Sequence, residues 1–135
     1  MAIAWAFEPI DDEDIERWLR TEAKEQLSEP KLVCARCAAH ITSESAQISI
    51  HGGHQHVFTN PHGLRFQIGC FGAATGCEFT GTYTLEWTWF PDYAWRVTQC
   101  ERCHTHLGWH FRDTSGDAKP PDFFGFISDR LASEN

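Results

Sequence analysis

Apolar and polar residues alternate along much of the chain after Lys31, and this period of two is typical of β-strands. Ala46, Ile48 and Ile50 alternate with polar neighbours, and four longer runs are rich in aromatic and β-branched residues. These runs are residues 64–71, 79–88, 95–99 and 107–112, separated by clusters of turn-forming residues. Residues 123–131 fit either a strand or a short helix. The pattern predicts a mostly β domain with antiparallel strands.

The first 29 residues follow a different pattern, which predicts a helix over residues 11–27. Ile15, Trp18 and Leu19 fall on one face of such a helix, and Asp11 is a favourable N-cap. Residues 1–29 hold nine acidic and three basic side chains, a net charge of −6. We therefore expect an acidic helical extension over residues 1–29 that packs on a β domain of residues 30–135. A helix that binds a partner is the alternative.

Composition and charge exclude several classes of partner. The chain has 135 residues, 41% of them hydrophobic, which suits one globular domain. Its net charge is −8 and it has no basic block, so we expect no nucleic-acid partner. No apolar run reaches the roughly 18 residues of a membrane span, and the first residues lack the pattern of a secretory leader. These observations predict a cytoplasmic protein with no membrane partner.

Two CxxC pairs predict a metal site. Cys34 and Cys37 form one pair, and Cys100 and Cys103 form the other. Each tight loop places two sulfurs on one side, so the two loops supply four thiolates at the tetrahedral geometry that suits Zn²⁺. A thioredoxin-like redox pair needs a βαβ unit, which surrounds neither pair. Since four thiolates close the coordination sphere, we predict one structural Zn²⁺ that holds the fold together.

Two cysteines and a group of histidines remain outside this set. Cys70 and Cys77 can be core thiols, a pair or a reactive site, and the core role is favoured because free cysteine is commonly buried. His54 and His56 offer a second metal site. A role as loop residues is favoured for them, because four cysteines are already available.

Aromatic residues crowd around the second CxxC pair. Four of the six tryptophans lie within 23 positions: Trp87, Trp89, Trp95 and Trp109. Residues two apart in a strand share a face, so Trp87 and Trp89 are expected to point the same way. The same holds for Trp109 and Phe111. Indoles from neighbouring strands can then wall a small box, although packing in the core explains them equally well.

A box of this kind suits either a flat neutral ring or a quaternary ammonium group held by cation–π attraction. Glu86 and Asp92 keep the ammonium option open. The residues alone leave this choice undecided.

Several motifs together resemble the thalidomide-binding (CULT) domain family of cereblon. They are WFPDYAW at 89–95, QCERC at 99–103, HLGWHF at 106–111, the first CxxC pair at 34–37 and NPHG at 60–63. The resemblance covers residues 31–131 and implies a β-tent, in which two antiparallel sheets are pinned by Zn²⁺. Relatives of that fold include B-type methionine sulfoxide reductases, Yippee-like proteins and Mis18 proteins.

The resemblance also implies a site. Cys34, Cys37, Cys100 and Cys103 would bind zinc. Trp89, Trp95 and Trp109 would form three walls of a pocket for cyclic imides, with Phe111 at its base and Asn60 at the ligand's edge. Trp87 occupies a rim position where cereblon has a histidine. The backbone of the Trp87–Trp89 segment would hydrogen-bond the imide.

The expected function is therefore a binding module, and not an enzyme, for thalidomide-type glutarimides, uracil-like rings or peptides that end in a cyclic imide. No Lon-like domain and no ubiquitin-ligase adaptor segment matches the chain, which resembles the single-domain bacterial members. The alternatives are an aromatic-cage reader of methylated ammonium groups and a methionine sulfoxide reductase with Cys70 or Cys77 as its nucleophile.

Overall fold

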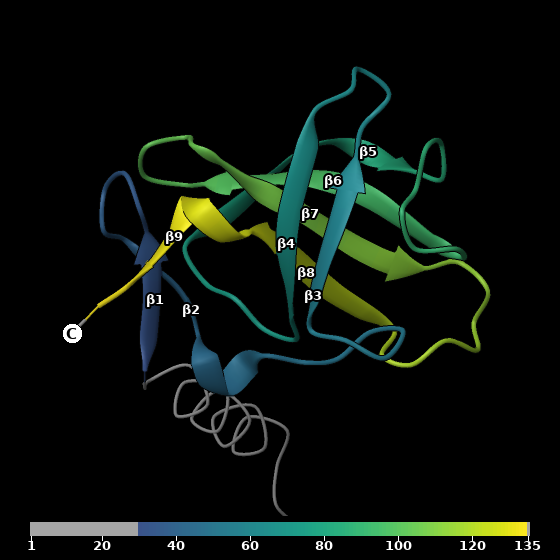
Figure 1. The fold of residues 1–135 in the computed structure, drawn as a ribbon, viewed down its shortest axis with the longest axis horizontal. Helices are drawn as coiled ribbons and strands as arrows, with labels where there is room; N and C mark the ends of the chain where they lie inside the picture. Colours follow the sequence, from purple (N-terminus) through teal and green to yellow (C-terminus); the bar gives the residue numbers. More distant parts are fainter. Residues whose placement is uncertain (1–29, 135) are drawn as a thin grey trace, which may run out of the picture.

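The computed structural model describes residues 30–134 of the chain, and strands dominate this part (Figure 1). The large strands are β3 (Gln55–Thr59), β4 (Arg65–Phe71), β5 (Cys77–Thr84), β6 (Tyr93–Cys100), β7 (His106–Asp113) and β8 (Asp122–Ile127). The short elements are β1 (Lys31–Cys34), β2 (His40–Ser43), β9 (Leu131–Ser133) and the 3₁₀ turns η1 (Glu44–Ala46) and η2 (Ser128–Arg130).

Two antiparallel sheets make up the described domain. The larger one has the strand order β3-β4-β8-β7-β6-β5, and the smaller one has the order β2-β1-β9. In Figure 1 the small sheet lies to one side of the large one, and the chain passes between them through η1 and η2. The fold is therefore mostly β with two antiparallel sheets, as the sequence predicts.

The hairpin of β6 and β7 runs through the centre of the large sheet. Its register places Trp95 opposite Phe111 and Val97 opposite Trp109. Side chains alternate between the two faces of a strand, so these four residues share one face. The residues between them in sequence, such as Arg96 and His110, pair on the other face.

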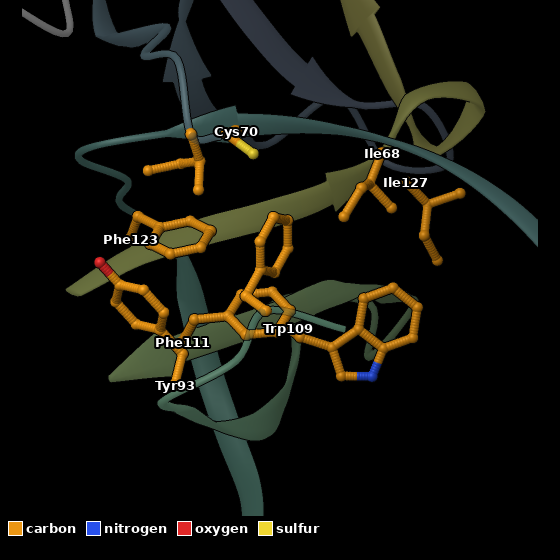
Figure 2. Packing of buried hydrophobic residues seen from close by; sticks show 9 residues of the cluster. Ile68, Cys70, Tyr93, Trp109, Phe111, Phe123 and Ile127 are labelled. Atoms are coloured by element: carbon orange, nitrogen blue, oxygen red, sulfur yellow. The ribbon is translucent and has the colours of Figure 1, made fainter. Parts of the chain in front are cut away.

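Two buried clusters support the large sheet. One contains Trp109 together with Phe111 and Phe123 (Figure 2), and Phe90 belongs to it as well. Phe111 and Phe123 stack at 5.0 Å between ring centroids, and Phe90 packs edge-on against both. The second cluster lies between the sheets and includes Cys34, Cys100, Leu107 and Phe126. One cluster thus supports the centre of the large sheet, and the other surrounds two of the paired cysteines.

The structure corrects the predicted strands in two places. Residues 46–50 alternate in hydrophobicity because Ala46 and Ile50 are buried, but Ala46 ends η1 and the residues after it make only isolated bridges. The predicted strand 79–88 ends at Thr84, and a turn follows in which Trp87 has φ 61°. The ambiguous segment 123–131 is strand β8 followed by η2. The expected N-terminal helix, and with it the domain boundary at residue 30, lies outside the described residues.

Gly108 permits the close approach of β7 to β8. A Cβ atom at this position would overlap the backbone oxygen of Gly125 and lie 2.9 Å from Cα of Phe126. Both obstacles are backbone, so a rotamer change cannot relieve the overlap.

We therefore expect Gly108→Ala to lower the free energy of unfolding by about 3 kcal/mol or more. Gly116→Ala is the matched control, because its φ is 87° but no atom lies within 4 Å of the added carbon. It should cost only about 1 kcal/mol of backbone strain. Urea denaturation followed by tryptophan fluorescence measures both, and equal losses would contradict the packing argument.

Candidate functional site

The four paired cysteines converge between the two sheets. Cys34 ends β1 and Cys100 ends β6, while Cys37 and Cys103 lie in the turns that follow. Their sulfur atoms all lie within 4.8 Å of one another, and the cross-pair distances Cys34–Cys103 and Cys37–Cys100 are both 3.6 Å. A tetrahedron with metal–sulfur bonds of about 2.3 Å has sulfur–sulfur edges of about 3.8 Å. The cluster therefore has the size of a Zn²⁺ site.

The two turns that carry these cysteines are built alike. The amide of Ala38 donates to the carbonyl of Cys34, and the amide of His104 donates to the carbonyl of Cys100, both at 2.8 Å. Ala38 and His104 also have nearly the same φ, 64° and 63°. Each turn thus curls its backbone around one sulfur, which is how four ligands from distant segments meet.

Hydrogen bonds already favour a thiolate within the cluster. The side chain and backbone of Thr105 lower the pKa of Cys103 to about 6, whereas burial raises the pKa of Cys100. Metal ligation requires thiolates, so at least one ligand is held in the charge state that a cation needs.

A cleft of about 640 Å³ lies on one face of the β6–β7 hairpin. Its lining includes all six residues predicted for a ligand site, which are Asn60, Trp87, Trp89, Trp95, Trp109 and Phe111. They come from the loop after β3, the turn after β5, and strands β6 and β7. A volume of this size suits a small organic ligand.

Perpendicular indoles form the core of the cleft. The rings of Trp89 and Trp109 lie 4.8 Å apart at 78°. Phe58 stacks on Trp89 at 4.9 Å and 8°, which fixes that indole from the side. Trp95 donates its Nε1–H to the backbone oxygen of Glu86 at 2.7 Å. The walls are therefore held by packing and by a hydrogen bond.

Both pairs of aromatic residues that were predicted to point the same way line the cleft. Trp109 and Phe111 line the same cleft, as expected, and the buried Phe111 joins its floor to the core. Trp87 and Trp89 also line this cleft, but from a turn and not from a strand, because the backbone at Trp87 has φ 61°. Trp87 is 67% exposed, so it forms the rim of the cleft and not an enclosed wall.

Asn60 organises the loop at the edge of the cleft. Its Oδ1 accepts the backbone N–H groups of His62 and Leu64, both at 2.9 Å. The side-chain carbonyl is thereby occupied, which leaves the Nδ2 hydrogens as the donors that this residue can offer to a ligand.

Sequence reasoning missed part of the lining. Phe66 packs edge-on against Trp109 at 5.3 Å, and His106 does so at 4.9 Å and 90°. Burial lowers the pKa of His106, so its ring is neutral near pH 7. The alternation of apolar and polar residues in β4 predicts that Phe66 lies on the apolar face of a strand. Nothing in the sequence shows that this strand lies beside the tryptophans.

Comparison with known proteins shows the same domain elsewhere. No protein-family model matches the chain. Cereblon from Danio rerio is 32% identical over 102 residues, which cover 74% of this chain and 24% of that protein. Cereblon from Gallus gallus is 32% identical over 102 residues, which cover 74% and 23%. The chain contains a cereblon-like CULT domain. It spans about a quarter of the length of these relatives.

A solved structure supports the fold of the CULT domain. The Yippee-like domain of Mis18 superposes with a TM-score of 0.53 at 15% identity, over 79% of this chain and 97% of that domain. At this identity the likeness concerns the fold alone.

The other residues that the sequence offered as reactive or metal-binding groups lie outside the cysteine cluster and the cleft lining. Burial raises the pKa values of Cys70 and Cys77 to about 12, so both are poor nucleophiles near neutral pH. A ring nitrogen of His54 is hydrogen-bonded to the backbone carbonyl of Ile48. A ring nitrogen of His56 is hydrogen-bonded to the backbone carbonyl of Gly53. Within residues 30–134 the four-cysteine group is the one cluster that can hold a metal. No helix in that range is long and apolar enough to cross a membrane.

The role of Asn60 in its loop can be tested directly. In Asn60→Ala the amides of His62 and Leu64 lose their acceptor, so their hydrogen exchange should accelerate about tenfold. Asn60→Asp keeps an acceptor oxygen and should leave both rates nearly unchanged. NMR-detected exchange measures the two amides separately, and equal rates in Asn60→Ala and the parent chain would refute the role.

Proposed function

We propose that this CULT domain is a zinc-stabilised binding module, not an enzyme, whose aromatic cleft takes up neutral cyclic imides. The ligand class comprises glutarimides of the thalidomide type, uracil-like rings and peptides that end in a cyclic imide. The observation that carries the proposal is that one backbone N–H and one backbone carbonyl beside the indoles have no hydrogen-bond partner among the described residues. Among the described residues, nothing hydrogen-bonds the backbone N–H of Trp89 or the carbonyl of Trp87.

An imide fits this arrangement because it alternates acceptor, donor and acceptor along one edge. Its N–H can donate to a free backbone carbonyl, and an imide oxygen can accept a free backbone N–H. The flat remainder of the ring then packs against Trp95 and Trp109. Because the lining is mostly apolar and the His106 ring is neutral, binding should depend on shape and hydrogen bonds.

The metal would act on the fold and not on the ligand. Four thiolates from Cys34, Cys37, Cys100 and Cys103 fill a tetrahedral sphere, so a Zn²⁺ ion there has no open position for water. The ion would join β1 of the small sheet to β6 of the large sheet. We therefore assign it a structural role.

The metal assignment predicts one Zn²⁺ per chain. Cys100→Ser should lose the metal and the folded state, since metal binding contributes on the order of 10 kcal/mol to small domains of this type. Cys77→Ser is the matched control, because Cys77 pairs with Cys100 across β5 and β6 but lies outside the ligand set. Elemental analysis and thermal melting measure both variants. A metal-free, well-folded Cys100→Ser protein would exclude this role.

The imide assignment predicts that the ligand N–H is essential. Glutarimide should bind with a Kd in the micromolar range or weaker. This assumes roughly half of the best known binding free energy per heavy atom for a ligand of about eight heavy atoms. N-methylglutarimide keeps the ring but loses the donor, so its affinity should fall about tenfold or more. Trp95→Ala and Trp109→Ala should also lose most affinity while retaining the metal. Tryptophan fluorescence titration measures these affinities, and equal binding of the N-methyl compound would reject the assignment.

A reader of methylated ammonium groups is a second candidate, because Glu86 lies at the cleft and is its one acidic lining residue among those described. Affinity for trimethyl-lysine should then fall in Glu86→Gln and at high salt. Affinity for a neutral imide should change little under both conditions, so the same titrations separate the two functions.

A further inference from the structure

The face of the large sheet opposite the cleft carries a second organised group of side chains. Tyr83 of β5, Arg96 of β6, and His110 and Arg112 of β7 lie there, together with Phe79 of β5. We call these five residues the arginine face. The proposed imide function does not use them, because the cleft lies on the other side of β6 and β7.

Both guanidinium groups are held against aromatic rings. The Arg112 guanidinium carbon lies 4.0 Å from the centroid of the Tyr83 ring. The Arg96 guanidinium carbon lies 5.6 Å from the same centroid and 5.3 Å from that of Phe79. Stacking of this kind occupies the flat sides of a guanidinium and leaves its N–H edge available.

The tyrosine that positions them is itself fixed. The Tyr83 hydroxyl bonds Nδ1 of buried His110 at 2.7 Å, and Nε2 of His110 bonds the Asp122 carboxylate at 3.1 Å. A carboxylate only accepts, so Nε2 of His110 carries the proton and donates to Asp122, while Nδ1 accepts from the Tyr83 hydroxyl. Burial lowers the pKa of His110, which keeps the ring neutral near pH 7. The positive charge of this face therefore comes from the two arginines.

Neither arginine has an anionic partner among the described residues. No carboxylate lies within ion-pair distance of Arg96 or Arg112 there, and neither guanidinium makes a hydrogen bond. Nε of Arg96 is buried and has no acceptor among residues 30–134. Two ordered cations without a carboxylate partner on a single face indicate that an anion belongs there.

We propose that residues 8–16 of the same chain dock on the arginine face through their carboxylates. This segment reads EPIDDEDIE and holds six acidic residues and no basic one. Residues 30–134 carry a net charge of only −2, so most of the net negative charge of the chain belongs to the residues N-terminal to this domain. The segment also contains two apolar residues, Ile10 and Ile15, which could pack against the exposed part of Phe79.

The segment can reach this face from its own chain. Fourteen residues separate Glu16 from Lys31. They span up to about 46 Å when extended, and about 30 Å when residues 17–27 form the helix that the sequence predicts. A domain of this size has a radius of gyration of about 13 Å, hence a diameter of about 34 Å. Tethering also gives the segment an effective concentration that a free acidic peptide would not have.

Photo-cross-linking in the full-length, zinc-loaded chain tests the proposal. A benzophenone amino acid replaces Ile10, and cross-linked peptides are identified by mass spectrometry. We expect intramolecular products with β5, β6 or β7. Their yield should fall about fivefold in R96Q/R112Q and in 1 M NaCl, where the Debye length is about 3 Å. R65Q/K119Q removes two exposed arginine and lysine charges elsewhere and should keep the yield within about twofold.

A charge-swapped chain separates direct pairing from a general loss of structure. R96E/R112E should lose the products, and adding D11K/D12K/E13K/D14K to it should restore them. Imide affinity should stay unchanged in R96Q/R112Q, so failure of the docking proposal and failure of the imide proposal give different results. Products that map to another surface, products between two chains, or yields insensitive to R96Q/R112Q would each overturn the proposal.

Discussion

The register between β6 and β7 is the constraint on which the other features depend. It sets Trp95 opposite Phe111 and Val97 opposite Trp109, so the cleft lining comes from both strands at once. A shift by one residue would move every one of these side chains to the opposite face. The close approach at Gly108 helps to fix where β8 pairs with this hairpin.

The same hairpin connects the cleft to the cysteine cluster. Cys100 is the last residue of β6, and the turn to β7 carries Cys103. The other two ligands come with β1, which belongs to the small sheet. A metal at this position would therefore anchor the hairpin to a second sheet. Such an anchor would also restrain the cleft, because β6 and β7 supply much of its lining.

The sequence was informative where a residue type determines its own chemistry. The two CxxC pairs predicted the cluster because thiolates at that spacing have few other uses, and β4, β6 and β7 follow their apolar patterns closely. Long-range placement was not predictable. Nothing local shows that Phe66 packs on Trp109, that Ala46 precedes an irregular segment, or that the chain turns at Trp87. The strand was predicted to continue to residue 88 because a period of two assumes an unbroken strand, whereas β5 ends at Thr84.

Alternation along β6 and β7 has an evolutionary consequence. Over the stretch where residues 95–97 pair with residues 109–111, the odd-numbered Trp95 and Trp109 face the cleft, while the even-numbered Arg96 and His110 face away. A substitution at one of these odd positions changes the lining of the cleft with little effect on the opposite surface, and the reverse holds at these even positions. Selection can therefore act on the two surfaces separately, so descendants of this hairpin can diverge on one face while the other is inherited unchanged.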